Sequence, residues 1–201
     1  MTKIFLLILS IFLLEFIIII EAFPQRLHLK KIITYNVTVP FANTRDFINK
    51  TSFRGGTFEL REMMGDNSFS LGAAAGWHVF NEVEYSTFNE GNISITGKQY
   101  RTINSFPLLL TYHKYNGEDE EKLRTYYGGG LGMQRILTSL ELGPFSSLNK
   151  QWHFALAPEA GLIYPISYRY SLLGSLKFNY AFKKSANPNT AYLSINAGIL
   201  F

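Results

Sequence analysis

The sequence predicts an all-β protein whose antiparallel strands close into a barrel. Three observations predict this fold. The only long apolar run lies within residues 1–22, the remaining chain repeatedly alternates apolar and polar residues, and the connections between the alternating segments are short and long in turn. The chain has 201 residues, a length that suits one domain or at most two small ones.

Composition favours a membrane environment for these strands. Charged residues make up 17% of the chain, below the roughly 25% that is usual for soluble domains. Phe (17) and Tyr (12) are abundant, and there is no Cys, which excludes disulfides, thiolate metal sites and a cysteine nucleophile. The formal net charge of +4 is mild and scattered, so the composition does not indicate a nucleic-acid partner.

The N-terminal segment reads as a secretory signal peptide. Lys3 precedes an apolar run from Ile4 to Ile20, and Ala22 offers a small residue at the cleavage position. The alternative is an uncleaved membrane helix, since the run is close to the ~17–25 residues that a spanning helix needs. Glu15 speaks against a stable span, because an ionised acid in hydrocarbon is costly. We therefore expect residues 1–22 to be a signal peptide and residues 23–201 to form one barrel domain.

Period-two alternation is clearest in residues 168–183 and 191–201. In the first segment Tyr170, Leu172, Leu176 and Phe178 share one parity, while the other parity is mostly polar. Successive side chains of a strand point to opposite faces, so the segment has one apolar face. Helical spacing would mix polar residues among the aromatics.

Eight segments show this alternation or are bounded by residues typical of turns. We expect strands near 30–41, 53–64, 68–81, 100–115, 123–137, 151–164, 168–183 and 191–201. Short connections are expected at 65–67, 116–122 and 165–167, and mostly longer ones at 42–52, 82–99, 138–150 and 184–190. Outer-membrane barrels have short periplasmic turns and longer external loops. The prediction is therefore an eight-stranded antiparallel transmembrane β-barrel in a bacterial outer membrane.

Motifs in the second half of the chain add a family resemblance. The stretches 106–112, 127–132 and 158–165, in this order, and the closing strand 191–201 with its terminal Phe resemble the small porin-like outer membrane protein β-barrel domain family. In Gram-negative barrels of this kind the last strand is the assembly signal, which implies that role for Leu193, Ile195, Ala197, Ile199 and Phe201. The resemblance implies the barrel assembly machinery as a partner. It implies no single shared activity.

Strand parity also predicts what fills the barrel. Eight strands enclose a space just wide enough for side chains. The residues expected to point inward as a polar lattice are Arg124, Gln134, Glu159, Arg169, Lys177 and Asn179, with His113 and His153 as further candidates. Glu159 is the only acid expected at the centre of these strands, and Lys177 lies on the next strand. A buried charge needs a partner or water, so we expect these two to pair.

Candidates for catalysis or metal binding are weak. Small lipid-modifying barrels pair a His with a Ser, but no His-x-Ser pair lies on one strand face here. His153 and Glu159 share a face yet lie roughly 20 Å apart along it. The acidic run 118–121 lacks the spaced oxygens and glycine of a calcium loop. We expect no enzyme activity, no cofactor and no metal.

The sequence therefore predicts a structural or surface-interaction barrel. Loops 42–52 and 82–99 are the expected interaction surface, and outer-membrane lipid and lipopolysaccharide are the expected surroundings of a monomer. A narrow passive channel is the alternative function, and a lipid-modifying enzyme is a further one.

Overall fold

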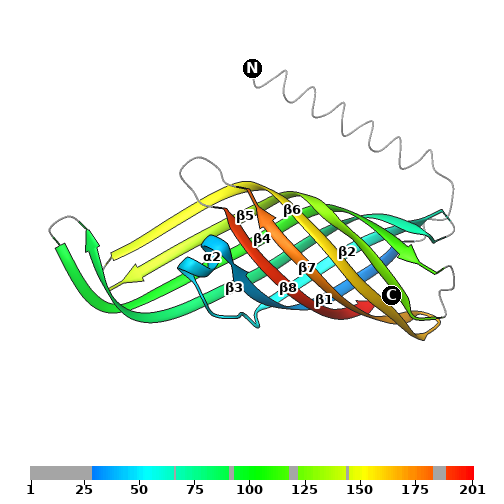
Figure 1. Cartoon of the computed structure of the whole chain (residues 1–201), viewed down its shortest axis with the longest axis horizontal. Helices are drawn as coiled ribbons and strands as arrows, with labels where there is room; N and C mark the ends of the chain where they lie inside the picture. The colour runs from blue at the N-terminus through cyan, green and yellow to red at the C-terminus, as the bar shows by residue number, and fades with distance from the viewer. Residues whose placement is uncertain (1–28, 66, 91–92, 118–121, 144, 183–188) are drawn as a thin grey trace, which may run out of the picture.

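The computed structural model is a closed barrel of eight antiparallel strands, which confirms the predicted fold class (Figure 1). It describes residues 29–65, 67–90, 93–117, 122–143, 145–182 and 189–201. The expected signal peptide at 1–22 and the acidic run 118–121 lie outside this range. The strands are β1 (Leu29–Phe41), β2 (Gly55–Met64), β3 (Phe69–Glu90), β4 (Ile93–Asn116), β5 (Arg124–Leu142), β6 (Phe145–Ser167), β7 (Tyr170–Ala181) and β8 (Thr190–Leu200).

Each strand pairs with its neighbours in the chain, and β1 pairs with β8 to close the ring. The closing ladder runs from Ile32↔Leu200 to Phe41↔Ala191. Beyond it, the backbone groups of Lys31 and Phe201 exchange two hydrogen bonds of 2.7 and 2.9 Å. Because the last residue takes part in this seam, the C-terminal Phe is part of the barrel wall.

The strands β3 to β6 are longer than predicted. Residues 82–99 and 138–150 were expected to be loops, but β3 and β4 pair as far as Glu90↔Ile93 and β5 and β6 as far as Leu142↔Phe145. Their polar composition indicated loops, yet a ladder of backbone hydrogen bonds needs no apolar face. Figure 1 shows these two hairpins continuing past the ring of the other strands.

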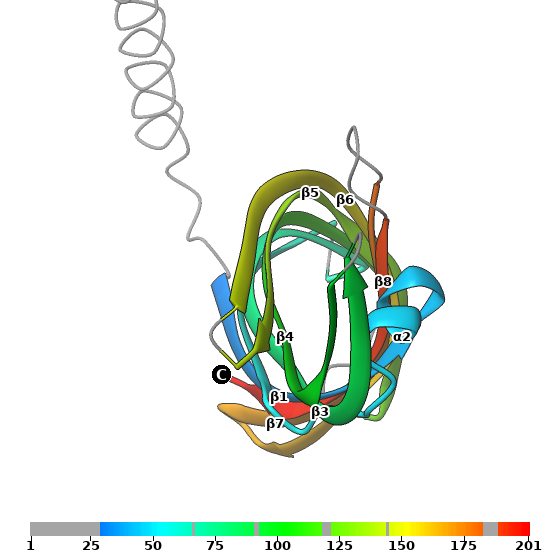
Figure 2. The ribbon, with the colours of Figure 1, turned by 90° about the vertical axis from the view of Figure 1, so that its left-hand side faces the viewer.

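We call the end that carries these hairpins the long-hairpin end, and the opposite one the short-turn end. The expected loop at 42–52 begins at the long-hairpin end with a short helix, α2 (Ala42–Phe47), which lies beside β8 (Figure 2). The chain then returns through an isolated bridge between Thr38 and Ser52. At the short-turn end the last turn is Tyr168–Arg169, because β6 continues to Ser167 instead of ending before Pro165. Among the described residues no helix is long and apolar enough to cross a membrane.

The outward face is an apolar band between two sets of aromatic rings. On β6 it runs from Phe154 through Leu156 and Leu162 to Tyr164, and these four side chains are exposed. On β7, Tyr170 and Phe178 flank Leu172 and Leu176 in the same way. Aromatic girdles around an aliphatic band are typical of barrels that contact lipid on the outside.

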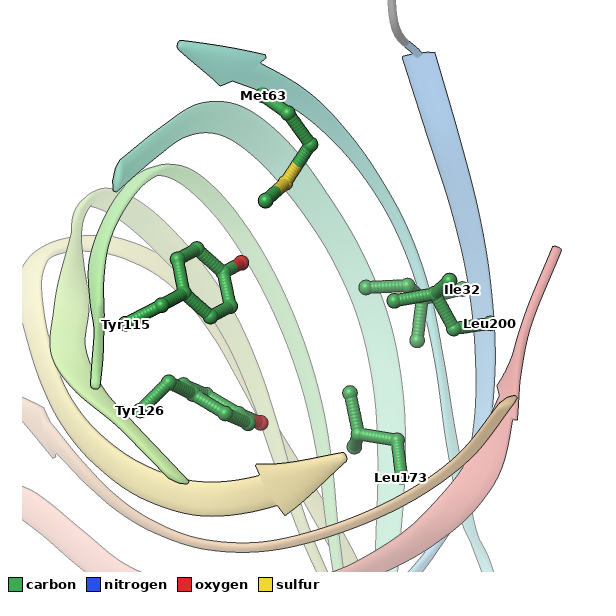
Figure 3. Close-up of a cluster of buried hydrophobic side chains, with 6 residues drawn as sticks. All are labelled: Ile32, Met63, Tyr115, Tyr126, Leu173 and Leu200. Carbon is green, nitrogen blue, oxygen red and sulfur yellow. The ribbon is translucent and has the colours of Figure 1, made fainter. Parts of the chain in front are cut away.

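The inside of the barrel is layered. Toward the short-turn end, a cluster of apolar side chains from six strands fills the space: Ile32, Met63, Tyr115, Tyr126, Leu173 and Leu200 (Figure 3). Toward the long-hairpin end a second cluster spans the ring: Ile48, Phe80, Ile103, Ile136, Ala181 and Tyr192. Ile48, from the segment that follows α2, is fully buried there. Polar side chains occupy the space between the two clusters.

Candidate functional site

A cluster of buried charges lies between the two apolar layers. It contains Glu59 and Arg61 from β2, His113 from β4, Glu159 from β6 and Lys177 from β7. All five are less than 10% exposed. On β4, residue 113 lies between Tyr115 of one apolar layer and Ile103 of the other, so the charges are enclosed along the barrel axis.

Glu59 and Arg61 form the tightest pair of the cluster. Arg61 Nε donates to Glu59 Oε1 at 2.8 Å and Nη2 donates to Oε2 at 3.0 Å. Residues two apart in a strand point to the same face, which brings this planar fork onto the carboxylate. Thr111 donates to Glu59 Oε1 at 2.9 Å, and the Arg61 guanidinium lies 4.7 Å from the Tyr126 ring centroid.

Glu159 is the second acid and is surrounded by donors and cations. Lys177 Nζ lies 2.8 Å from Glu159 Oε2, and Tyr126 donates to Oε1 at 2.7 Å. Arg61 Nη2 is 3.6 Å from Oε1, and His113 Nε2 is 3.5 Å from Oε2. His113 therefore faces both acids, since its Nδ1 is 3.8 Å from Glu59 Oε1. Two acidic side chains, Glu59 and Glu159, thus face two basic ones, Arg61 and Lys177, in the layer.

Small residues make room for these long side chains. In the ladders, Gly128 lies between His113 and Glu159. A Cβ at Gly128 would sit 2.0 Å from the Tyr112 carbonyl oxygen and 2.7 Å from His113 Cα. The wall carries no side chain at this point, and His113 and Glu159 meet inside it. The glycine-rich run that the sequence shows at 128–132 thus forms the thin side of the lumen.

Neutral polar residues extend the filling along β1, β7 and β8. Asn36 donates to Asn196, which donates to Ser175 at 2.9 Å, and Asn179 donates to Ser194 at 3.0 Å. Closer to the long-hairpin end, Gln134 donates to Ser105 at 2.7 Å, and Ser105 is bonded to Tyr192 at 2.9 Å. These bonds satisfy polar groups that are shielded from water.

The structure places the six residues of the predicted lattice in different surroundings. Glu159 and Lys177 lie in the charge cluster, while Gln134 and Asn179 lie in the neutral networks. Arg124 is buried near the short-turn end, with its guanidinium 4.9 Å from the Tyr115 ring centroid. The prediction for Arg169 is wrong, because this residue is exposed in the turn between β6 and β7.

The sequence did not reveal two of the five members of the charge cluster, Glu59 and Arg61. Glu159 was expected to be the only central acid, but Glu59 is equally buried in β2 and carries its own partner, Arg61. The alternation in β2 could have revealed this pair. Phe58 and Leu60 share one face of the strand, and the other face carries Thr57, Glu59, Arg61 and Met63. The two charges side by side made that parity look like a solvent face.

The described histidines other than His113 lie outside the charge cluster. His153 Nδ1 is 2.9 Å from the Phe182 carbonyl oxygen, and His78 packs against the Tyr192 ring at 5.3 Å. None of the described histidines is hydrogen-bonded to a serine. In the described part of the chain no three His, Asp or Glu residues form a group suited to a metal ion.

Comparisons with known proteins find the fold but no close relative. No family model matches the sequence, and no curated protein matches it. Among solved structures, Ail, the attachment invasion locus protein of Yersinia pestis, is 14% identical and superposes with a TM-score of 0.52 over 86% of this chain and 97% of Ail. A major outer membrane protein of Thermus thermophilus is 10% identical, with a TM-score of 0.50 over 86% of this chain and 98% of that one. The chain thus has the fold of the eight-stranded outer-membrane β-barrels.

Proposed function

We propose that this chain is a bacterial outer-membrane barrel with a structural or surface-interaction role, and that its lumen is a filled support for the hairpins at one end. The apolar outer band with its aromatic girdles supports the membrane location. The inner layers support a structural lumen, because a charge cluster between two apolar clusters leaves the charges paired with one another.

The observation that carries the surface role is the four-stranded extension formed by β3 to β6. β2 pairs with β3 only as far as His78, and β7 pairs with β6 only as far as Ala155. The next residue of each strand still makes a backbone hydrogen bond, because the Val79 N–H donates to the Arg54 carbonyl and the Phe182 N–H donates to the Phe154 carbonyl, both at 2.9 Å. Beyond Val79 and Phe154 the outer edges of β3 and β6 have no strand partner in the described part of the chain. Unpaired edge groups are a template on which an extended peptide can add as a further strand.

Exposed aromatic and apolar side chains lie on the same extension. Tyr85 and Val83 on β3, Tyr100 on β4, and Phe145 and Leu148 on β6 are all exposed. Aromatic side chains are enriched at protein interfaces because they supply contact area at small entropic cost. The extension, which includes the described part of the expected segment 82–99 as paired strands, is the surface that we propose meets an external protein.

In this proposal the short-turn end faces the periplasm, and the barrel assembly machinery inserts the chain by recognising β8. Leu193, Ile195, Ala197, Ile199 and Phe201 form the outward-facing side of that strand. The surrounding partners are outer-membrane lipid and lipopolysaccharide, and the barrel acts without a cofactor or a catalytic residue.

Site-directed labelling tests the location and the orientation together. The chain has no native Cys, so a single introduced Cys is the only thiol. In intact cells a membrane-impermeant maleimide should label Tyr85→Cys on the extension and leave Asn116→Cys, at the short-turn end, unlabelled. After permeabilisation both should react. Equal labelling of both positions in intact cells, or of neither, contradicts the proposal.

A further inference from the structure

A pocket lined by apolar and neutral polar side chains opens at the long-hairpin end, between α2 and the strands β4, β5 and β6. Its volume is about 290 Å³, close to the lower limit of about 300 Å³ for small-molecule sites. One wall is formed by Asn43 and Thr44 of α2 and by Asn189, and the opposite wall by Ser147, Asn149 and Gln151 of β6. The pocket lies on the far side of the apolar layer from the charge cluster, so it is a separate site.

The lining offers neutral hydrogen-bonding groups of both kinds. Four amides and the hydroxyls of Thr44, Thr138, Ser147 and Thr190 belong to the lining, and such groups can donate and accept. Part of this capacity is used within the protein, because Asn43 donates to Asn189, Asn189 donates to Tyr180, and the Ala191 N–H donates to Thr44. None of the described residues that line the pocket is Asp, Glu, Lys or Arg. A charged ligand would therefore lose hydration there without gaining an opposite charge, whereas an uncharged polar ligand would not.

His153 adds one directed group at the base of the pocket. Its Nδ1 lies 2.9 Å from the Phe182 carbonyl oxygen, which can only accept, so Nδ1 carries the hydrogen. In this tautomer Nε2 is the acceptor atom of the ring. His153 is buried, so the main-chain contact holds the ring in place before any ligand enters.

Apolar groups complete the lining. Ile103 and Ile136 lie at the bottom, and Phe47 contributes an aromatic ring from α2. Arg101 holds this ring in place, because its Nη1 donates to the Phe47 carbonyl at 3.3 Å and its guanidinium lies 5.7 Å from the ring centroid. A sugar ring combines an apolar C–H face with hydroxyls that donate and accept, which is the combination this lining matches.

We infer that this pocket binds one uncharged sugar unit of a glycan. The ligand class follows from the amides and hydroxyls around an apolar floor, the small volume and the lack of Asp, Glu, Lys or Arg among the lining residues that the structure describes. That the sugar comes from outside the cell rests on the proposed orientation. Binding itself does not, so it can be measured on purified protein independently of location.

The test uses the full chain refolded in micelles of a phosphocholine detergent, which has no sugar head group. Saturation-transfer NMR is recorded with methyl glucoside, methyl galactoside and N-acetylglucosamine as neutral probes, and with glucuronic acid and glucosamine as charged ones of similar size. We expect saturable binding of at least one neutral probe, and affinity at least about tenfold lower for the charged analogues, as when one charge is left unpaired.

Two pocket variants and one control keep the result interpretable. Gln151→Leu removes a donor and an acceptor, and Ser147→Trp fills the mouth from an exposed position. Each should weaken binding at least about tenfold. The control, Asn116→Leu, removes an amide at the opposite end and should bind like the unaltered chain. Heat-modifiable mobility shows that each variant is folded.

Competition distinguishes the two sources of such a sugar. Vesicles that contain lipopolysaccharide with its core sugars should displace the neutral probe if the membrane's own glycan is the ligand, and vesicles with lipid A alone should not. Failure of both to compete assigns the site to a soluble or host glycan. No saturable binding of any neutral probe, or full binding by folded Ser147→Trp, would overturn the inference.

Discussion

Glu159 and Lys177 face each other across the β6–β7 ladder, and Lys177 Nζ lies 2.8 Å from Glu159 Oε2 inside the barrel. Glu159→Gln should lower the free energy of unfolding by about 3–5 kcal/mol, because it leaves a buried ammonium without its partner. The double change with Lys177→Gln should recover part of this loss, since neither charge is then stranded. Urea unfolding in lipid vesicles measures the cycle. Strictly additive losses would show that the two groups are not coupled.

Arg61 should not be replaceable by lysine. Arg61→Lys loses the paired bonds to Glu59 and the contact with Tyr126, so we expect a loss of about 1.5–3 kcal/mol in unfolding free energy. Arg135→Lys is the matched control, because Arg135 lies beside Trp152 on the outer wall. Equal effects of the two substitutions would argue against the buried fork.

Gly128 should tolerate no side chain. Gly128→Ala places a Cβ 2.0 Å from the Tyr112 carbonyl oxygen and should cost about 1–3 kcal/mol through forced displacement of the backbone. At Gly174 the nearest atom to such a Cβ is 3.8 Å away, so Gly174→Ala should leave stability unchanged or slightly higher. The same unfolding assay compares them, and a tolerant Gly128 would contradict the described register.

Leu176 should contact lipid. Leu176→Arg near the middle of β7 should cost about 2–4 kcal/mol, because the guanidinium must enter the hydrocarbon or deform it. Leu176→Ala tests the position without a charge and should cost far less. If the arginine variant unfolds at the same urea concentration as the alanine variant, the outward face does not meet lipid.

Phe201 should be needed for assembly. Its backbone closes the seam with Lys31, and its ring lies 6.5 Å from that of Tyr170. Deleting Phe201 should reduce the fraction that reaches the outer membrane in heat-modifiable form, while Phe201→Trp should preserve it by keeping an aromatic end. Normal yield from the deletion would remove the basis for the proposed assembly signal.

The fold was predictable because the outer wall obeys a strict rule. Residues such as Leu172, Leu176 and Phe178 must face lipid, so every second position is apolar and the alternation is visible in the sequence. Outside the lipid-facing band the outer side chains need not be apolar. Residues 82–99 were therefore predicted to be a loop, although β3 and β4 continue there. The backbone ladder that holds them there leaves no pattern in the side chains.

The interior was less predictable, because no contact with lipid constrains the side chains that face the lumen. The pairing of Lys177 with Glu159 could be predicted, because the two residues lie on strands that are adjacent in the chain. The contacts of Arg61 and His113 with the same carboxylate could not, because these residues come from the more distant strands β2 and β4. Arg169 was assigned inward by extending the β7 parity through a turn, where parity has no meaning. The sequence shows that Gly128 leaves the barrel wall without a side chain, but it does not show that His113 and Glu159 meet there.

In the proposed function, the charge cluster and the two apolar layers close the lumen, so that the barrel supports a surface and does not conduct. Planar-bilayer recording of the refolded chain tests this most directly. We predict no steady open-channel current in the unaltered protein, with its folded, inserted state shown by heat-modifiable mobility of the same reconstituted sample. A stable ohmic current that disappears when Gly130 is replaced by a plug-filling Leu would contradict the claim and favour the passive channel.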